Sequence, residues 1–357
     1  MKKGIRFEKH VQKSTFHNPM LGNELDTQEI TIRRDPLTGY QSVFNPSLED
    51  KVAVFFGPTD QALIDRLAQE SQERCFLCND TWKLATPTYP KELVPDGRIQ
   101  VGKAVLFPNL FPVAHVHAVI RVGDKHYVRL GDFDPGMIME AFQVSSEFVK
   151  ALSKGEPDVR YITINGNYLH PAGASIPHPH FQIAGADLPF TYMEGLFDHS
   201  RRYLQEHGSC YWSDIVEVEK ELGERYIGET GPACWIASFS PQGTNEILGI
   251  LPERRDFLEM DDKDLEGLAQ GLSSVLKGYD SMGVSTFNFA VYSGPLGEED
   301  DSLRCYIRII SRQNVYENYR TDDYFLQKLL RNELILTPPE ILATTMRGIM
   351  EKPKGER

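Results

Sequence analysis

The two halves of the chain repeat one order of predicted elements, and this duplication constrains the fold more than any other feature of the sequence. In each half, two strand-like runs precede an amphipathic helix and two more strand-like runs follow it. The first copy comprises runs at 104–108, 114–122, 160–165 and 178–184 with a helix at 136–152. The second comprises runs at 233–239, 246–251, 286–292 and 304–310 with a helix near 265–279.

Strands that occur in pairs around a single helix are typical of an α+β fold, in which helices pack on one face of an antiparallel sheet. A length of 357 residues is suited to two such domains. We therefore predict a catalytic domain at 1–195 and a second domain of the same type at 205–357. A short linker is expected between them, near residues 190–210.

Charge and hydropathy exclude several classes of function. The formal net charge is −13, which opposes nucleic-acid binding because such binding depends on basic residues that meet phosphates. A small phosphorylated ligand is still compatible, since a few arginines and backbone N–H groups are enough to hold one phosphate. The basic amino end is not followed by an apolar stretch, and no later run reaches the length of a membrane span. We expect a cytoplasmic protein with no membrane partner.

The segment from Gly173 to Ile183 contains the most informative pattern of polar residues. Side chains alternate along a strand, so in an extended segment the polar residues share one face and the apolar residues the other. The polar face would carry His178, His180 and Gln182, behind a Gly-Ala-Ser turn with free N–H groups. The alternative is a half-buried strand whose histidines only meet solvent.

Cys75 and Cys78 form a Cys-x-x-Cys pair in a chain with five cysteines, which favours a metal site over a disulfide framework. Thiolates at this spacing suit Zn²⁺, and two further ligands would close a tetrahedron. The alternatives are a simple turn or a redox pair. His115 and His117 share a strand face and compete as ligands, although a hydrogen-bonded core histidine is the preferred interpretation for both.

Three motifs in order across residues 30–185 resemble one known family. Gly173 to Gln182 is similar to the active-site signature Gly-x-Ser-x-x-His-x-His-x-Gln of galactose-1-phosphate uridylyltransferase and its sugar-nucleotide phosphorylase relatives. The segment 109–126 resembles a strand-turn pattern of that superfamily that ends in a histidine. Arg33 to Gly39 resembles the opening segment of the uridylyltransferases. The chain therefore resembles the galactose-1-phosphate uridylyltransferase-like branch of the histidine-triad superfamily, which implies two domains of that type.

The resemblance implies a nucleotidyltransferase that exchanges a nucleoside monophosphate between a nucleotide sugar and a hexose 1-phosphate. His180 would attack the α-phosphorus and hold the nucleotide covalently. Ser175 and nearby N–H groups would bind the phosphate oxygens. Gln182 would bind a nonbridging oxygen and favour transfer over hydrolysis.

The resemblance also implies the remaining site residues. The ligands of a structural Zn²⁺ would be Cys75, Cys78, His126 and His178. The substrate-binding residues would be Asn109 near the base, Asn165 or Asn167 upstream of the serine, Gly173 and Ala174 in the turn, and Arg33 and Arg34. A homodimer is an arrangement that the family often adopts.

The second half lacks the catalytic and metal-binding groups. When the two copies are aligned, Arg255, Arg304 and Tyr306 take the positions of His126, His178 and His180, respectively. We expect it to be non-catalytic, with structural and substrate-binding roles.

Two other functions are compatible with the same residues. The nucleotide could pass to inorganic phosphate, which would make the protein a nucleoside-diphosphate-sugar or dinucleotide phosphorylase. From a different class, the chain could be a zinc-stabilised nucleotide-binding module without turnover.

Overall fold

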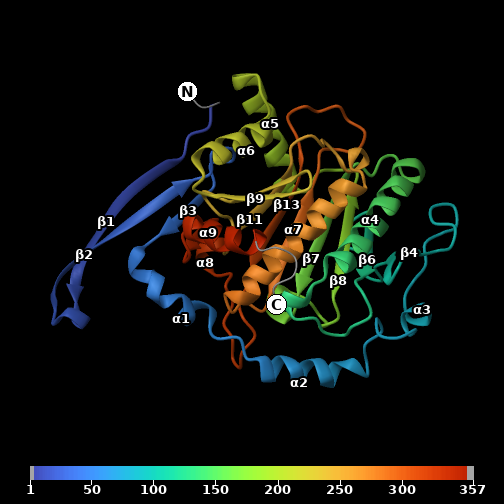
Figure 1. Cartoon of the computed structure of the whole chain (residues 1–357), viewed down its shortest axis with the longest axis horizontal. Helices are drawn as coiled ribbons and strands as arrows, with labels where there is room; N and C mark the ends of the chain where they lie inside the picture. Colours follow the sequence, from blue (N-terminus) through green and yellow to red (C-terminus); the bar gives the residue numbers. More distant parts are fainter. Residues whose placement is uncertain (1–3, 352–357) are drawn as a thin grey trace.

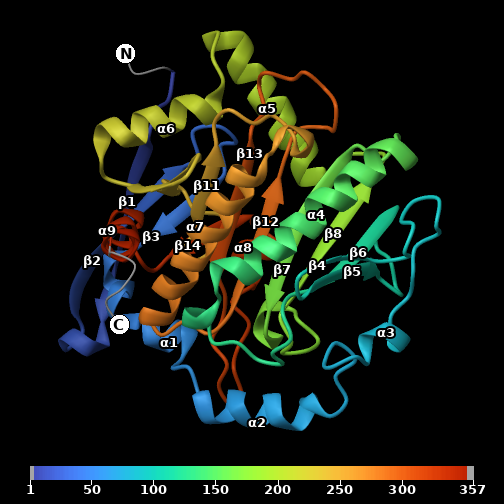
Figure 2. The ribbon, with the colours of Figure 1, turned by 45° about the vertical axis from the view of Figure 1, so that its right-hand side comes forward.

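A single antiparallel sheet of ten strands runs through both halves of the protein (Figures 1 and 2). It is seen in a computed structural model that describes residues 4–351. Listed in spatial order, its strands are β4 (Ile99–Val101), β5 (Ala104–Pro108), β6 (Val116–Arg121), β8 (His180–Ala186), β7 (Tyr161–Tyr168), β12 (Phe287–Tyr292), β13 (Cys305–Ser311), β11 (Ile247–Leu251), β10 (Ala233–Ala237) and β9 (Tyr226–Thr230). The predicted α+β class and the duplication are therefore confirmed.

The two copies meet where β7 pairs with β12. The pairing runs antiparallel from Tyr168 opposite Phe287 to Thr163 opposite Tyr292. From this junction outward, the strand order of one half mirrors that of the other. The sequence predicted two sheets; the structure joins them into one, because the edge strand β7 of the first copy pairs with the edge strand β12 of the second.

The long helices α4 (Pro135–Gly155) and α7 (Asp262–Ser281) lie on the same face of this sheet (Figure 2). Their apolar residues recur at three- and four-residue spacing, as the sequence indicated. Phe142 and Phe148 of α4 and Leu268 and Leu272 of α7 are buried in one continuous core. The last helix, α9 (Pro339–Met350), packs against α7.

The opposite face of the second half is covered by α5 (Thr191–His207) and α6 (Tyr211–Leu222). The predicted linker at 190–210 is therefore wrong, since α5 occupies it. Met193, Leu196 and Tyr203 are buried at helical spacing, between charged residues that made the segment look like a connection. The division into domains at 195 and 205 stays a prediction.

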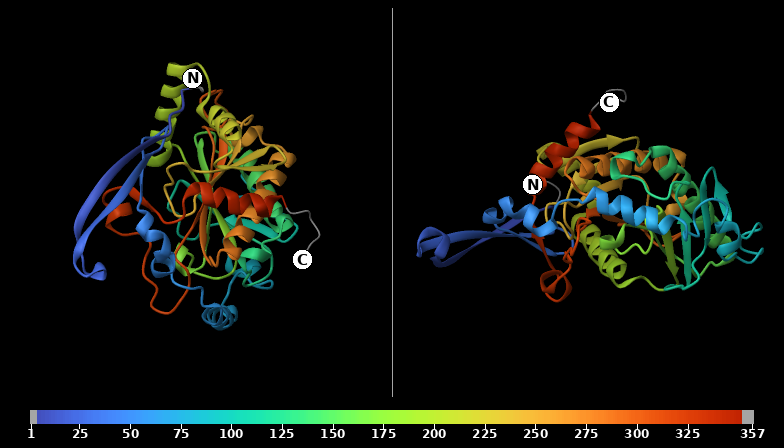
Figure 3. Two further views of the ribbon diagram at one scale, coloured as in Figure 1. Left: turned by 60° about the vertical axis from the view of Figure 1, so that its left-hand side comes forward. Right: turned by 90° about the horizontal axis from the view of Figure 1, so that it is seen from below.

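A smaller sheet lies beside the main one. Its strands, in spatial order, are β1 (Glu8–Asn18), β2 (Glu24–Arg34), β3 (Gln41–Phe44) and β14 (Asn332–Ile335), with β14 parallel to β3. The β1–β2 hairpin extends away from the body of the molecule (Figure 3). The short helices are α1 (Val52–Phe56), α2 (Gln61–Gln72), α3 (Trp82–Ala85) and α8 (Phe325–Lys328).

None of the helices within residues 4–351 combines the length and the apolar character needed to cross a membrane.

Helix α7 packs closely on β10 at Gly271, where there is no room for a larger side chain. A Cβ atom at Gly271 would lie 1.8 Å from Cζ2 of Trp235, whose ring is fully buried and whose Nε1 donates to Thr230 Oγ1. We expect Gly271→Ala to lower the free energy of unfolding by about 1–3 kcal/mol, because the fixed ring cannot yield. Gly195→Ala in α5, where nothing lies within 4 Å, should instead raise it by up to about 1 kcal/mol. Equal thermal midpoints for the two variants would contradict this account.

Candidate active site

The alternation of side chains along β8 separates a core face from a polar face. Phe181 and Ile183 are buried in the main core, and Phe181 packs edge to face on Phe289 with ring centroids 4.7 Å apart. His180 and Gln182 point the other way, into a pocket of about 450 Å³. Burial of the two apolar residues therefore sets the direction of the two polar ones.

Four of the predicted site residues line this pocket: Asn109, Ser175, His180 and Gln182. Its walls are largely apolar and include Phe107, Leu110, Phe111 and Ile176. Leu110 and Phe111 belong to a loop between β5 and β6 and are 67% and 79% exposed, so they stand at the mouth of the pocket. An apolar enclosure with a few convergent polar groups is the usual form of a small-molecule site.

The ring of His180 is held in one orientation by the backbone. Its Nδ1 lies 2.9 Å from the carbonyl oxygen of His178. Because a carbonyl only accepts, Nδ1 donates and Nε2 keeps the lone pair. Burial lowers the pKa of His180, which favours the neutral ring that a nucleophile needs.

Gln182 has a partner that the sequence interpretation missed. His117 Nε2 lies 2.8 Å from Gln182 Oε1, and His117 Nδ1 accepts from the backbone N–H of Val113 at 3.2 Å. His117 is buried, as expected, but it belongs to the site rather than to the core. His115 is exposed, so its interpretation as a core histidine is wrong. The two-residue spacing of His117, Val119 and Arg121 on one face of β6 was the available signal.

The turn that carries Ser175 is held by the second half of the protein. Asn288 of β12 donates to the carbonyl of Ala172 at 2.9 Å and to Asn167 Oδ1 at 2.7 Å. Gly173 has φ +91°, a left-handed conformation that glycine adopts without strain. Ala174 is buried, and Ser175 is exposed beside the pocket.

The two candidate asparagines on β7 are both engaged within the protein. Asn167 accepts from Asn288, as described above, and Asn165 donates to Thr163 Oγ1 at 2.9 Å. Asn165 lies opposite Gln182 in the β7–β8 pairing. Neither asparagine lines the pocket of His180.

The four predicted metal ligands converge beside this pocket. The ligand atoms of Cys75, Cys78, His126 and His178 all lie within 4.8 Å of one another, and all four residues are buried. Cys78 Sγ is 3.3 Å from His126 Nδ1 and 3.4 Å from His178 Nδ1, and Cys75 Sγ is 3.8 Å from His178 Nδ1.

These separations fit a tetrahedral ion. Metal–sulfur bonds of about 2.3 Å and metal–nitrogen bonds of about 2.0 Å give ligand–ligand edges of about 3.5 Å in a tetrahedron. Both rings also have a partner for the other nitrogen: His126 Nε2 is 2.9 Å from Ser71 Oγ, and His178 Nε2 is 3.3 Å from Gly123 O. Such outer partners orient metal-binding histidines. The cluster is thus compatible with a metal site.

Arg121 holds the loop between the two cysteines. Its guanidinium is buried and donates from Nε to the carbonyl of Leu77 at 2.6 Å. Arg121 lies opposite His180 in the β6–β8 pairing. The Cys75–Cys78 loop and the strand of His180 are therefore positioned by the same part of the sheet.

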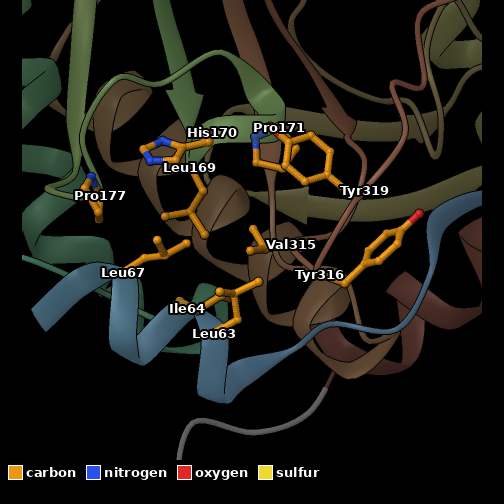
Figure 4. Close-up of a pocket in the computed structure, with 10 residues that line it drawn as sticks. All are labelled: Leu63, Ile64, Leu67, Leu169, His170, Pro171, Pro177, Val315, Tyr316 and Tyr319. Carbon is orange, nitrogen blue, oxygen red and sulfur yellow. The ribbon is translucent and has the colours of Figure 1, made fainter. Parts of the chain in front are cut away.

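A small apolar pocket lies beneath the Ser175 turn and joins it to α2 (Figure 4). Leu63, Ile64 and Leu67 of α2 face Leu169, Pro171 and Pro177 of the turn region across about 60 Å³. Because α2 leads directly to Cys75, this packing connects the cysteine loop to the turn.

The structure does not bring Arg33 and Arg34 to the pocket of His180. Arg33 is 5% exposed and makes a bidentate ion pair with Glu340, at 2.8 and 3.0 Å, over the ring of Phe239. Arg34 ends β2 and is exposed. Glu340 therefore engages the guanidinium of Arg33, which the sequence analysis had assigned to substrate binding.

The corresponding face of the second half is filled by protein. Tyr306 and Arg308 of β13 occupy the places of His180 and Gln182, and Tyr306 stacks on Trp212 of α6 with centroids 4.2 Å apart. Arg255 pairs with Glu259, and Arg304 donates to Pro252 O.

Comparison with known proteins gives the same picture as the geometry. No model of a protein family matches the sequence. An uncharacterized protein of Archaeoglobus fulgidus is 30% identical over 347 residues, which cover 97% of this chain and 99% of that protein. Galactose-1-phosphate uridylyltransferase of Thermotoga maritima is 29% identical over 148 residues, which cover 40% of this chain and 46% of the relative. The crystal structure of an ADP-glucose phosphorylase from Arabidopsis thaliana with bound ADP-glucose superposes with a TM-score of 0.69 at 18% identity, covering 89% of this chain and 98% of that one.

The duplicated α+β unit is the fold of that phosphorylase, and the sequence relatives of stated activity are nucleotide-sugar enzymes, namely galactose-1-phosphate uridylyltransferases and an ADP-glucose phosphorylase. The chain is therefore a homologue of the galactose-1-phosphate uridylyltransferases and of ADP-glucose phosphorylase, and it belongs to one family with the Archaeoglobus fulgidus protein.

The contact of Asn288 with the Ser175 turn can be tested by hydrogen exchange. Asn288→Ala removes both donors that hold Ala172 O and Asn167. We expect faster exchange of the turn amides of Gly173 and Ala174, which now donate to His170 O and Leu169 O, while amides of α4 stay unchanged. Asn165→Ala on the neighbouring strand β7 serves as the control and should leave the turn unaffected. Unaltered exchange in Asn288→Ala would show that the turn is held by other contacts.

Proposed function

We propose that the protein transfers a nucleoside monophosphate from a nucleotide sugar to a hexose 1-phosphate, with His180 as the nucleophile. The observation that carries this proposal is the fixed ring of His180, whose Nδ1 donates to His178 O and whose Nε2 keeps its lone pair beside a pocket of about 450 Å³. A pocket of that volume is in the range that encloses a small ligand.

The reaction divides into two displacements. His180 Nε2 attacks the α-phosphorus, the bond from phosphorus to the oxygen of the sugar phosphate breaks, and the sugar phosphate leaves with that electron pair. An oxygen of the acceptor phosphate then attacks the same phosphorus and releases Nε2. The Nδ1–H bond to His178 O stabilises the positive ring of the intermediate, and two successive steps replace one difficult displacement.

Ser175 and Gln182 line the part of the pocket beside His180 where the phosphoryl oxygens would lie. Fixed donors at such a position stabilise developing charge without reorganisation. The N–H groups of Gly173 and Ala174, which the sequence suggested would be free for the phosphate, instead donate to His170 O and Leu169 O. We assign Asn109 and the apolar loop beside it to the nucleoside, because both line the outer part of the same pocket. The second half contributes support to the turn through Asn288.

The buried ligand set Cys75, Cys78, His126 and His178 fits Zn²⁺, since two thiolates and two imidazoles make a closed tetrahedral shell. The ion would have a structural role, because all four positions belong to protein side chains. It would tie α2 and the cysteine loop to His178, two residues before the start of β8.

A second candidate keeps His180 and changes the acceptor to inorganic phosphate. The fold shared with an ADP-glucose phosphorylase favours this alternative. The two candidates differ only in which acceptor discharges the intermediate, and a binding module without turnover would form no intermediate.

We expect about one Zn²⁺ per chain by elemental analysis. Cys75→Ser should lose the ion and unfold at a lower temperature, because binding of a structural zinc contributes directly to folding. Cys210→Ser is the matched control: this buried thiol donates to Ser302 O, far from the cluster, and its replacement should keep the zinc. Full zinc content and an unchanged thermal midpoint in Cys75→Ser would remove Cys75 from the site.

We expect His180 to become covalently nucleotidylated when the protein meets its nucleotide sugar without an acceptor. The adduct should be visible in the intact mass at neutral pH and disappear after mild acid, as a phosphoramidate does. Its mass increment identifies the nucleotide. His180→Ala should abolish the adduct while keeping the zinc, whereas His115→Ala should retain it.

Discharge of the isolated adduct then separates the two candidates. A hexose 1-phosphate should regenerate the free enzyme; discharge by inorganic phosphate alone would favour the phosphorylase. If UDP-, ADP- and GDP-sugars bind and none modifies the wild-type protein, covalent transfer is wrong and the binding module is the better account.

A further inference from the structure

The side-chain amide of Gln182 has two ends with opposite hydrogen-bonding properties, so its orientation decides what it offers a ligand. The oxygen only accepts and the nitrogen only donates. A nonbridging phosphoryl oxygen requires the nitrogen. The orientation of this amide is therefore a functional variable of the pocket, and it is controlled by whichever group contacts the other end.

His117 is that group, and a backbone N–H determines its tautomer. Val113 N–H points at His117 Nδ1 from 3.2 Å, and a backbone N–H only donates. Nδ1 must therefore carry a lone pair, which in the neutral ring leaves the proton on Nε2. Nε2 lies 2.8 Å from Gln182 Oε1 and donates to it. The amide oxygen is thereby engaged, and the NH₂ group is the end that remains for the pocket.

The neighbouring Asn109 is consistent with the same assignment. Asn109 Oδ1 accepts from the backbone N–H of Phe111 at 3.0 Å, which turns its NH₂ group toward His117. Asn109 Nδ2 is 3.3 Å from His117 Nε2, but Nε2 already carries a proton directed at Gln182. The NH₂ group of Asn109 is thus a second donor that the protein leaves uncommitted in this pocket.

We propose that His117 is a positioning residue that sets the Gln182 amide with its NH₂ group toward the phosphoryl oxygens and ties this orientation to the loop Leu110–Ala114 at the pocket mouth. The proposal rests on nucleotidyl transfer by His180. One ring joins the two parts of the site, because Nδ1 holds the loop through Val113 and Nε2 holds the amide. A loop that moved away from His117 would release the tautomer, and with it the orientation of Gln182.

Three substitutions separate the two functions of the ring. The terminal atoms of asparagine reach about as far as Nδ1, and those of glutamine about as far as Nε2. His117→Gln keeps the bond to Gln182 and loses the bond to Val113. His117→Asn keeps the bond to Val113 and loses the bond to Gln182. His117→Phe keeps the shape of the ring and loses both bonds. His115→Phe, two residues earlier and exposed, is the matched control. Zinc content and thermal midpoint of each variant establish that it is folded.

The rate of His180 nucleotidylation is the first measurement. His117→Phe and His117→Asn should slow it by about tenfold to a hundredfold, the effect of a misdirected donor at a phosphoryl group. His117→Gln should recover most of the rate. In a Gln182→Ala background, His117→Phe should cause no further loss, because His117 acts through Gln182. An equal loss with and without Gln182, or no loss in His117→Phe, would overturn the proposal.

The tautomer is the second measurement, and it does not depend on activity. Ring nitrogen shifts of ¹⁵N-histidine-labelled protein, with the His117 signals identified by their absence in His117→Gln, should show a protonated Nε2 and an unprotonated Nδ1. A protonated Nδ1 would overturn the proposal. A wild-type protein with the expected tautomer and no nucleotidylation would instead contradict the proposed transfer, so the two failures are distinguishable.

Discussion

Burial of Phe181 and Ile183 on the helix-covered face of β8 is the constraint on which the site depends. Neither residue can turn outward without exposing a large apolar side chain and opening a void in the core, which costs several kcal/mol. A shift of β8 by one residue would therefore be strongly unfavourable. This register determines the positions of His180 and Gln182. Packing on one side of the strand therefore decides which polar groups face the pocket on the other side.

The cluster of Cys75, Cys78, His126 and His178 makes the position of His180 depend on a distant part of the chain as well. Its cysteines follow α2, whereas its histidines flank β6 and β8, so four side chains from three segments have to meet. His178 contributes its ring to the cluster and its carbonyl to His180. A displacement of the cysteine loop would therefore move the carbonyl that orients the ring of His180. His178 thus links the geometry of the Cys75, Cys78, His126 and His178 cluster to the orientation of the His180 ring.

Much of the site was predictable because it is local in sequence or periodic. The alternation of the His-Pro-His-Phe-Gln run predicted both faces of β8, and apolar spacing predicted α4 and α7. The failures have different causes. Arg33 was expected to bind a substrate, but it forms an ion pair with Glu340, a residue 307 positions later in the sequence. The role of His117 follows from a backbone N–H in a loop, which no side-chain pattern reveals. The helix at 191–207 was hidden by its charged outer face.

The β1–β2 hairpin has a consequence for colloidal behaviour. Within the described part of the chain, β1 has a neighbour on one side only, so the outer backbone edge of Glu8–Asn18 is open along eleven residues. An open edge of this length is a template on which a strand of another molecule can add. Lys9 and Lys13 are exposed on this strand, and charges there oppose such addition because a docking strand would have to desolvate them. The charges that oppose strand addition at this edge thus belong to side chains outside the pocket of His180.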